Sequence, residues 1–140
     1  LKKNNIKIIK KSSYYETPSY PDKTKPKYIN IAVSIETNLS TTKLASIIIK
    51  IEEILERKRL NKNDPRTCDI DIIDFNSRII NFNYNGFYFN VPHIKLCERN
   101  FVLYPLLEIA PNWIHPETKT NIITLIDNLS AEDKKSILKI

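Results

Sequence analysis

The sequence predicts an α+β protein in which helices pack on an antiparallel sheet. Two patterns carry this prediction. Residues 28–37 alternate between apolar and polar side chains, as a half-buried strand does. Residues 44–55 instead repeat apolar side chains at helical spacing, and they follow Ser40, a residue type that caps helices.

The first half of the chain predicts two strands. Residues 6–16 form a strand of mixed polarity that ends at Thr17-Pro18, and the polar, proline-bearing residues 19–27 form a surface loop. Residues 28–37 form the second strand. Its side chains divide between two faces, one with Ile29, Ile31, Val33 and Ile35 and the other with Tyr28, Asn30, Ala32 and Ser34.

The second half predicts helices and shorter strands. The helix after Ser40 ends in Glu56-Arg57-Lys58-Arg59. The later elements are a strand at 69–75, short strands around 78–80 and at 87–91, an irregular-to-helical stretch at 92–110, a turn or short strand at 112–118 and a terminal helix capped by Ser130 with Asp133. This order is typical of a ferredoxin-like domain, here a single one over residues 1–140.

Composition excludes several kinds of protein. Gly86 is the only glycine, so the chain has neither a glycine-rich phosphate loop nor a dinucleotide fingerprint. Cys68 and Cys97 lack metal-ligand spacing, which favours reduced thiols in a cytoplasmic protein. No apolar run approaches the roughly 18 residues of a membrane helix, and no signal peptide is visible, so no membrane partner is expected.

The net charge of +6 is concentrated at the start of the chain. Residues 1–11 hold five lysines and no acid, whereas the rest carries 17 basic and 16 acidic residues. A broad basic face for nucleic acid is therefore not expected. The chain begins at Leu1 and contains no methionine, so we expect a fragment or a processed form of a longer protein.

Two carboxylates stand two residues apart within Pro65-Arg66-Thr67-Cys68-Asp69-Ile70-Asp71-Ile72. In an extended segment Asp69 and Asp71 point to the same side, while the isoleucines point to the other. Two hard oxygen ligands beside an arginine suit magnesium and a polyphosphate. The alternative is a half-exposed edge strand whose aspartates are only solvated.

A basic cluster precedes this pair. Residues 57–66 contain five cations and one acid, Asp64; the cations are Arg57, Lys58, Arg59, Lys62 and Arg66. Phosphoryl-type transfer needs positioned cations on phosphate oxygens and exclusion of water, which such a loop can supply. Favourable interaction with the helix C-terminus is the alternative role for residues 57–59.

Blocks at 12–18, 28–33, 65–72, 91–93 and 99–106 resemble the 6-hydroxymethyl-7,8-dihydropterin pyrophosphokinases of folate synthesis, in order from about residue 12 to residue 111. The resemblance implies transfer of pyrophosphate from ATP to the pterin hydroxymethyl group, with release of AMP. It implies two Mg²⁺ ions held by Asp69 and Asp71. It also implies that ATP and the dihydropterin are the partners, with no nucleic acid, and we expect a monomer.

The resemblance also assigns site residues. Arg57 and Arg66 match arginines that contact the ATP phosphates, and the further nucleotide-site residues are Glu52, Arg59, Ile72, His93 and Arg99. The pterin-site residues are Thr17, Pro18, Tyr28, Asn30 and Phe101. Without the resemblance, Tyr28 and Phe101 would be core aromatics, Thr17-Pro18 a strand terminator and His93 structural. His115 matches no family role and is expected on the surface.

The chain departs from the family pattern at several points. We expect the family's opening strand, its Gly-Ser-Asn-Leu turn and most of its first helix to be missing before Leu1. Glu56 stands where the family has glycine, and the loop before Pro65 has no tryptophan. These departures predict an intact metal site and an altered closing loop.

Two other functions remain open at this point. A ferredoxin-like RNA-binding module would use the lysine-rich leader and exposed tyrosines, with Tyr14, Tyr15 and Tyr28 as a stacking surface. The Asp69/Asp71 pair argues against it, because carboxylates repel phosphate unless a metal intervenes. The third hypothesis is an inactive remnant of the kinase that still binds ATP.

Overall fold

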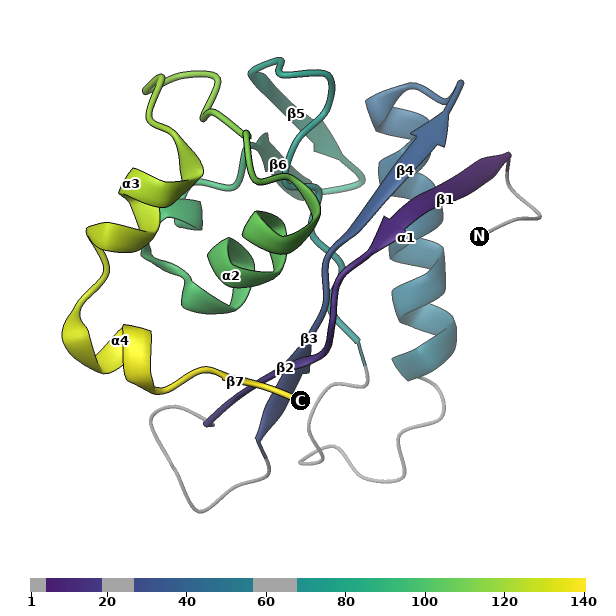
Figure 1. Ribbon diagram of the computed structural model, residues 1–140. Coiled ribbons are helices and arrows are strands. Elements are labelled where there is room, and N and C mark those ends of the chain that lie inside the picture. Colours follow the sequence, from purple (N-terminus) through teal and green to yellow (C-terminus); the bar gives the residue numbers. More distant parts are fainter. Residues whose placement is uncertain (1–4, 19–26, 57–67) are drawn as a thin grey trace. The chain divides into compact units, whose positions relative to one another are not determined.

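The computed structural model of the protein describes residues 5–18, 27–56 and 68–140 (Figure 1). They fall into two compact units, one of Leu1–Ile6 with Thr37–His93 and the other of Lys7–Glu36 with Ile94–Ile140. Each unit contains helix and antiparallel strand. The predicted α+β class is therefore confirmed, and the mixture of elements is consistent with a ferredoxin-like fold.

In the part of the first unit that the structure describes, one long helix and one hairpin are the main elements. Helix α1 (Thr41–Glu56) begins as predicted, because the Ser40 Oγ accepts the Lys43 N–H at 3.2 Å. The helix contacts the hairpin of β5 (Ile80–Tyr84) and β6 (Phe87–Val91). Asn85 and Gly86 form its turn with φ of 48° and 83°, the left-handed pair that a two-residue hairpin requires.

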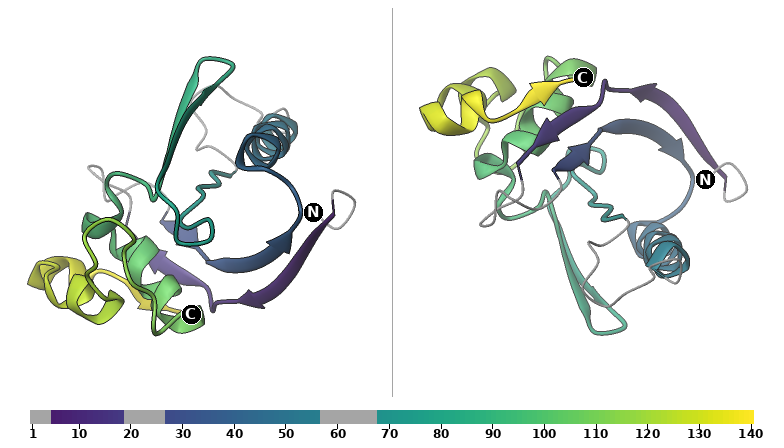
Figure 2. Two further views of the ribbon diagram at one scale, coloured as in Figure 1. Left: turned by 90° about the horizontal axis from the view of Figure 1, so that it is seen from above. Right: turned by 90° about the horizontal axis from the view of Figure 1, so that it is seen from below.

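The second unit contains most of the strands. Strand β1 (Ile6–Lys11) pairs with β4 (Val33–Thr37). Strand β2 (Tyr15–Thr17) lies between β3 (Tyr28–Asn30) and β7 (Leu138–Lys139), antiparallel to both. Figure 2 shows β7 running alongside β2.

Each predicted long strand is thus divided in two, and the described residues form three small sheets in place of the expected single one. The division occurs at Ser12, whose N–H donates to the Ala32 carbonyl oxygen at 2.9 Å while its Oγ accepts the Ala32 N–H at 2.9 Å. A side-chain oxygen here replaces one backbone partner, which interrupts the ladder without leaving the Ala32 N–H unsatisfied.

The alternation in residues 28–37 does not mark a buried face. Ile29 is 60% exposed, and Ile31 and Val33 are exposed as well. The apolar core of this unit lies instead among its helices, where η2 (Leu96–Glu98), α2 (Asn100–Ile109) and α3 (Ile122–Asp127) are found. Their fully buried side chains include Leu96, Leu103 and Ile122.

Local hydrogen bonds define the C-terminal helices. The Asn121 Oδ1 accepts the Thr124 N–H at 2.8 Å and begins α3, a helix that was not predicted. The Ser130 Oγ accepts the Asp133 N–H at 3.1 Å and begins α4 (Ala131–Lys135), as predicted. Buried Asn100 donates from Nδ2 to the Asp133 carbonyl oxygen at 2.7 Å, which ties α4 to the start of α2.

His115 is not a surface residue, contrary to the prediction. Its side chain is 6% exposed. The Nδ1 accepts the N–H groups of Glu117 and Thr118 at 3.1 and 3.3 Å, so the imidazole holds a turn together. The ring also meets Trp113 edge to face. Polar side chains that satisfy neighbouring backbone donors in this way are commonly buried in turns.

One carboxylate on α2 gathers donors from two strands of the second unit. Glu108 accepts the Ser13 N–H on Oε2 and the Tyr15 hydroxyl on Oε1, the latter at 3.0 Å. Lys139 of β7 places its Nζ 3.2 Å from the same Oε1. Desolvation opposes ionisation, but the hydrogen bonds from Ser13, Tyr15 and Lys139 outweigh it and lower the pKa of Glu108 from 4.5 to about 2.

Among the described residues, no helix has the combination of length and apolar composition that crossing a bilayer requires.

The depressed pKa of Glu108 predicts a specific acid sensitivity. The pKa of Glu108 is about 2 in the folded protein and has an ordinary value of 4.5. Between these pH values the folded protein therefore binds fewer protons than the unfolded protein. The contribution to stability is therefore fully present above pH 4.5 and is lost as the pH falls through about 2. Urea unfolding measured across this pH range should give an unfolding free energy that rises with pH, with a slope that corresponds to uptake of up to about one proton on unfolding. Glu108→Gln should remove this slope. The same slope in both proteins would contradict the assignment.

Candidate functional site

The Asp69–Asp71 segment alternates between exposed and half-buried residues as predicted, but it is not a strand. Asp69 and Asp71 are both exposed, whereas Ile70 and Ile72 are half-buried. No described strand pairs with residues 68–74, so the predicted strand at 69–75 is wrong as an assignment. An extended segment counts as a strand only when a neighbour completes its backbone hydrogen bonds.

A glutamate of α1 supplies one of the missing backbone partners. The Glu52 Oε2 accepts the Ile70 N–H at 2.7 Å, in a partly buried position. Ile70 lies between the two aspartates, so this bond restrains the backbone from which both carboxylates project. Charged acceptors make short hydrogen bonds of this kind stronger than neutral ones.

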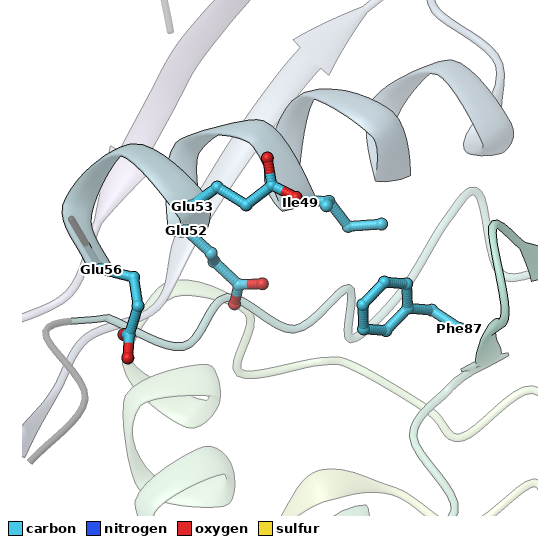
Figure 3. Close-up of a pocket in the computed structure, with 5 residues that line it drawn as sticks. All are labelled: Ile49, Glu52, Glu53, Glu56 and Phe87. Atoms are coloured by element: carbon cyan, nitrogen blue, oxygen red, sulfur yellow. The ribbon is translucent and has the colours of Figure 1, made fainter. Parts of the chain in front are cut away.

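Glu52 also lines a pocket of the first unit. Ile49, Glu52, Glu53 and Glu56 come from α1, and Phe87 comes from β6 (Figure 3). The pocket combines apolar side chains with carboxylates. Its charge suits hydroxyl or amino donors and disfavours phosphate groups.

The donor set at Asp69 and Asp71 fits magnesium. Magnesium is usually held by one or two carboxylates, with water and substrate phosphates completing its coordination. Two exposed carboxylates that flank a restrained residue match that description. In the parts of the chain that the structure describes, no three His, Cys, Asp or Glu side chains gather as a metal cluster.

Three of the predicted pterin-site residues share one face of the β2–β3 pair. Thr17 is opposite Tyr28, and Tyr15 is opposite Asn30. Opposite residues of an antiparallel pair project from the same face, as do residues two apart. Tyr15, Thr17, Tyr28 and Asn30 therefore line one face. Since Tyr15 bonds to Glu108, this is the face that α2 covers at Tyr15.

Phe101 and Arg99 stand at the start of α2 and touch. The Arg99 guanidinium carbon lies 5.4 Å from the centroid of the Phe101 ring, a cation–π contact. Phe101 is half-buried and is therefore partly accessible. A residue predicted for the nucleotide thus contacts one predicted for the pterin.

The predicted site residues divide between the two units. Glu52, Asp69, Asp71, Ile72 and His93 belong to the first unit. Thr17, Pro18, Tyr28, Asn30, Arg99 and Phe101 belong to the second. Arg57, Arg59 and Arg66 lie outside the described residues, so the predictions for them stay untested.

Sequence reasoning missed Glu108, although a signal was present. Residues 101–109 are otherwise almost entirely apolar, and a lone carboxylate in such a helix needs hydrogen-bond partners.

Comparison with known proteins decides the family. Residues 1–111 match the family of 7,8-dihydro-6-hydroxymethylpterin-pyrophosphokinases. This chain belongs to that family. The match includes every predicted site residue, from Thr17 to Phe101.

Individual pterin pyrophosphokinases agree with this result. The chain is 35% identical over 126 residues to 2-amino-4-hydroxy-6-hydroxymethyldihydropteridine pyrophosphokinase of Synechocystis, which covers 90% of this chain and 62% of that protein. The Haemophilus influenzae protein of the same name is 32% identical, with 94% and 78% covered. Folic acid synthesis protein fol1 of Pneumocystis carinii is 32% identical over 95% of this chain, which corresponds to 17% of its own length.

Removing the Glu52 side chain should loosen the aspartate segment. Glu52→Ala deletes the acceptor of the Ile70 N–H and should cost about 1–2 kcal/mol of unfolding free energy. Hydrogen exchange of the Ile70 amide should accelerate, which can be followed by NMR without metal or nucleotide. Glu53→Ala removes an exposed carboxylate one residue away and should leave that amide protected. Equal exchange in both variants would rule out the bond.

Proposed function

We propose that this chain transfers a pyrophosphoryl group from ATP to 6-hydroxymethyl-7,8-dihydropterin in folate synthesis, with AMP as the second product. The observation that carries this proposal is the family match over residues 1–111, because it includes both predicted half-sites. The paired exposure of Asp69 and Asp71 and the shared face of Thr17, Tyr28 and Asn30 support it.

In the proposed reaction the pterin hydroxymethyl oxygen attacks the β-phosphorus of ATP. The bond from that phosphorus to the oxygen bridging the α- and β-phosphates breaks, AMP leaves with this oxygen, and the hydroxyl proton passes to solvent. Asp69 and Asp71 would hold magnesium, which when bound neutralises phosphate charge. Arg57 and Arg66 would place cations on the phosphate oxygens.

The remaining nucleotide contacts are proposed from the resemblance to the family. Glu52 would act chiefly through the Ile70 backbone, since its carboxylate is directed there. The pocket beside it, with Ile49 and Phe87, suits the sugar or base end of a nucleotide. Arg59, Ile72, His93 and Arg99 are proposed as further ATP contacts.

We propose that the pterin-binding part of the site lies on the β2–β3 face. Asn30 and Thr17, with the backbone near Pro18, would bind the amide edge of the ring. Tyr28 would line the pocket and Phe101 would stack on the ring. The RNA-binding hypothesis is weakened by the same face, because Tyr15 is 7% exposed and its hydroxyl is bonded to Glu108.

The first prediction for this function concerns product formation. Incubation with ATP, magnesium and the dihydropterin should release AMP, and omission of the pterin or chelation of magnesium should stop it. Asp71→Asn should lower the rate about 100-fold or more, because a metal ligand loses its charge. Circular dichroism should show that this variant stays folded.

The alternatives give different results. ATP binding without AMP release would indicate the inactive remnant. Oligonucleotide binding that survives chelation, without AMP release, would indicate the RNA-binding module.

Truncation of Phe101 tests the aromatic contact. Phe101→Ala should raise the KM for the pterin about three- to tenfold, as expected from the loss of a stacked ring, and should change the KM for ATP less. Steady-state kinetics with each substrate varied in turn measures both values. A parallel rise in the two KM values would argue against stacking.

A further inference from the structure

The predicted pterin residues of the second unit lie on two elements that need a fixed relation. Thr17, Tyr28 and Asn30 belong to the β2–β3 face, and Phe101 belongs to α2. A ring that is held between polar groups on a sheet and an aromatic side chain on a helix requires the helix and the sheet to keep a fixed relative position. Displacements of about 1 Å can already be costly in such sites.

Glu108 lies where these elements can be joined. It follows Phe101 by seven residues, so the two side chains lie within about 20° of each other around the helix. On the sheet, Tyr15 shares its face with Thr17, Tyr28 and Asn30. The Tyr15 hydroxyl donates to the Glu108 Oε1 at 3.0 Å. The bond therefore joins the Phe101 side of the helix to the Asn30 face of the sheet.

The other partners of Glu108 restrain the same strand. The Ser13 N–H donates to its second oxygen immediately before β2. Lys139 pairs with Tyr15 in the β2–β7 register and is 60% exposed at its side chain. An exposed ion pair contributes little, so Ser13 and Tyr15 are the important donors.

The titration behaviour of the two side chains agrees with this geometry. Burial, the hydrogen bond to Glu108 and its charge raise the pKa of Tyr15 from 10 to about 12. With the pKa of Glu108 lowered to about 2, hydroxyl donor and carboxylate acceptor both persist at neutral pH.

We propose that Glu108 is a positioning residue for the pterin pocket, which sets α2 and Phe101 against the sheet face of Thr17, Tyr28 and Asn30. This inference rests on the proposed function. It assigns Glu108 no contact with substrate; its effect passes through Tyr15 and Ser13.

The test compares binding of the two substrates in matched variants. Isothermal titration with 6-hydroxymethylpterin and, separately, with a non-hydrolysable ATP analogue and magnesium gives two dissociation constants. Glu108→Ala should weaken pterin binding about tenfold and nucleotide binding less than about twofold. Tyr15→Phe, which keeps the ring and removes only the hydroxyl, should weaken pterin binding about threefold.

Leu106→Ala is the control for simple destabilisation. Leu106 is buried on the same helix and has no side-chain bond to β2, so its truncation should lower the Tm at least as much. Below that Tm its pterin affinity should stay within about twofold of the unchanged protein. Equal pterin loss in Leu106→Ala and Glu108→Ala would overturn the positioning role, as would unchanged affinity in Tyr15→Phe.

The outcomes separate this inference from the proposed function. If the unchanged protein binds no pterin, the proposed function fails and the inference fails with it. If the protein binds pterin and releases AMP but Glu108→Ala and Tyr15→Phe bind normally, the inference alone fails. If Glu108→Ala does not fold, Tyr15→Phe decides the result.

Discussion

The carboxylate of Glu108 is the constraint on which the second unit depends. Its strands β2, β3 and β7 have only three, three and two residues, too few to be stable through their own ladders. Helix α2 must therefore hold them, and Glu108 is the polar group through which it does so, by accepting the Ser13 N–H and the Tyr15 hydroxyl. Hydrogen bonds to an ionised acceptor are stronger than those between neutral groups. Leaving such an acceptor without its donors is costly.

In the first unit, too, a helical glutamate accepts a backbone N–H group. No described strand pairs with residues 68–72, and the Ile70 N–H is accepted by Glu52 of α1. Residues 12–14 similarly interrupt a ladder, and the Ser13 N–H is accepted by Glu108 of α2. In both places a helical glutamate satisfies a backbone donor that no neighbouring strand reaches. Each glutamate thereby restrains a segment next to predicted site residues, the aspartate pair in one case and Thr17 in the other.

These long-range hydrogen bonds also show how far the sequence could predict the structure. Local signals were reliable: the caps at Ser40 and Ser130 and the alternating exposure around Asp69 and Asp71 all appear. Sheet membership was not predictable, because it depends on partners far away in the chain. Ser12 and Ala32 are 20 residues apart, and their two bonds divide the predicted strands. Helix α3 was missed despite Asn121, an N-cap residue followed by Ile122, Leu125 and Ile126 at helical spacing.

The contact between Arg99 and Phe101 constrains how the proposed site can work within the second unit. The guanidinium covers one side of the aromatic ring at 5.4 Å from its centroid. In the proposed site a flat pterin would then stack on the other side, so Arg99 would define which side of Phe101 receives substrate. A cation also attracts the ring's electron-rich face, which favours one orientation of Phe101. If Arg99 contacts ATP as proposed, occupancy of the nucleotide site would alter this contact, and binding of one substrate would affect binding of the other through residues only two positions apart.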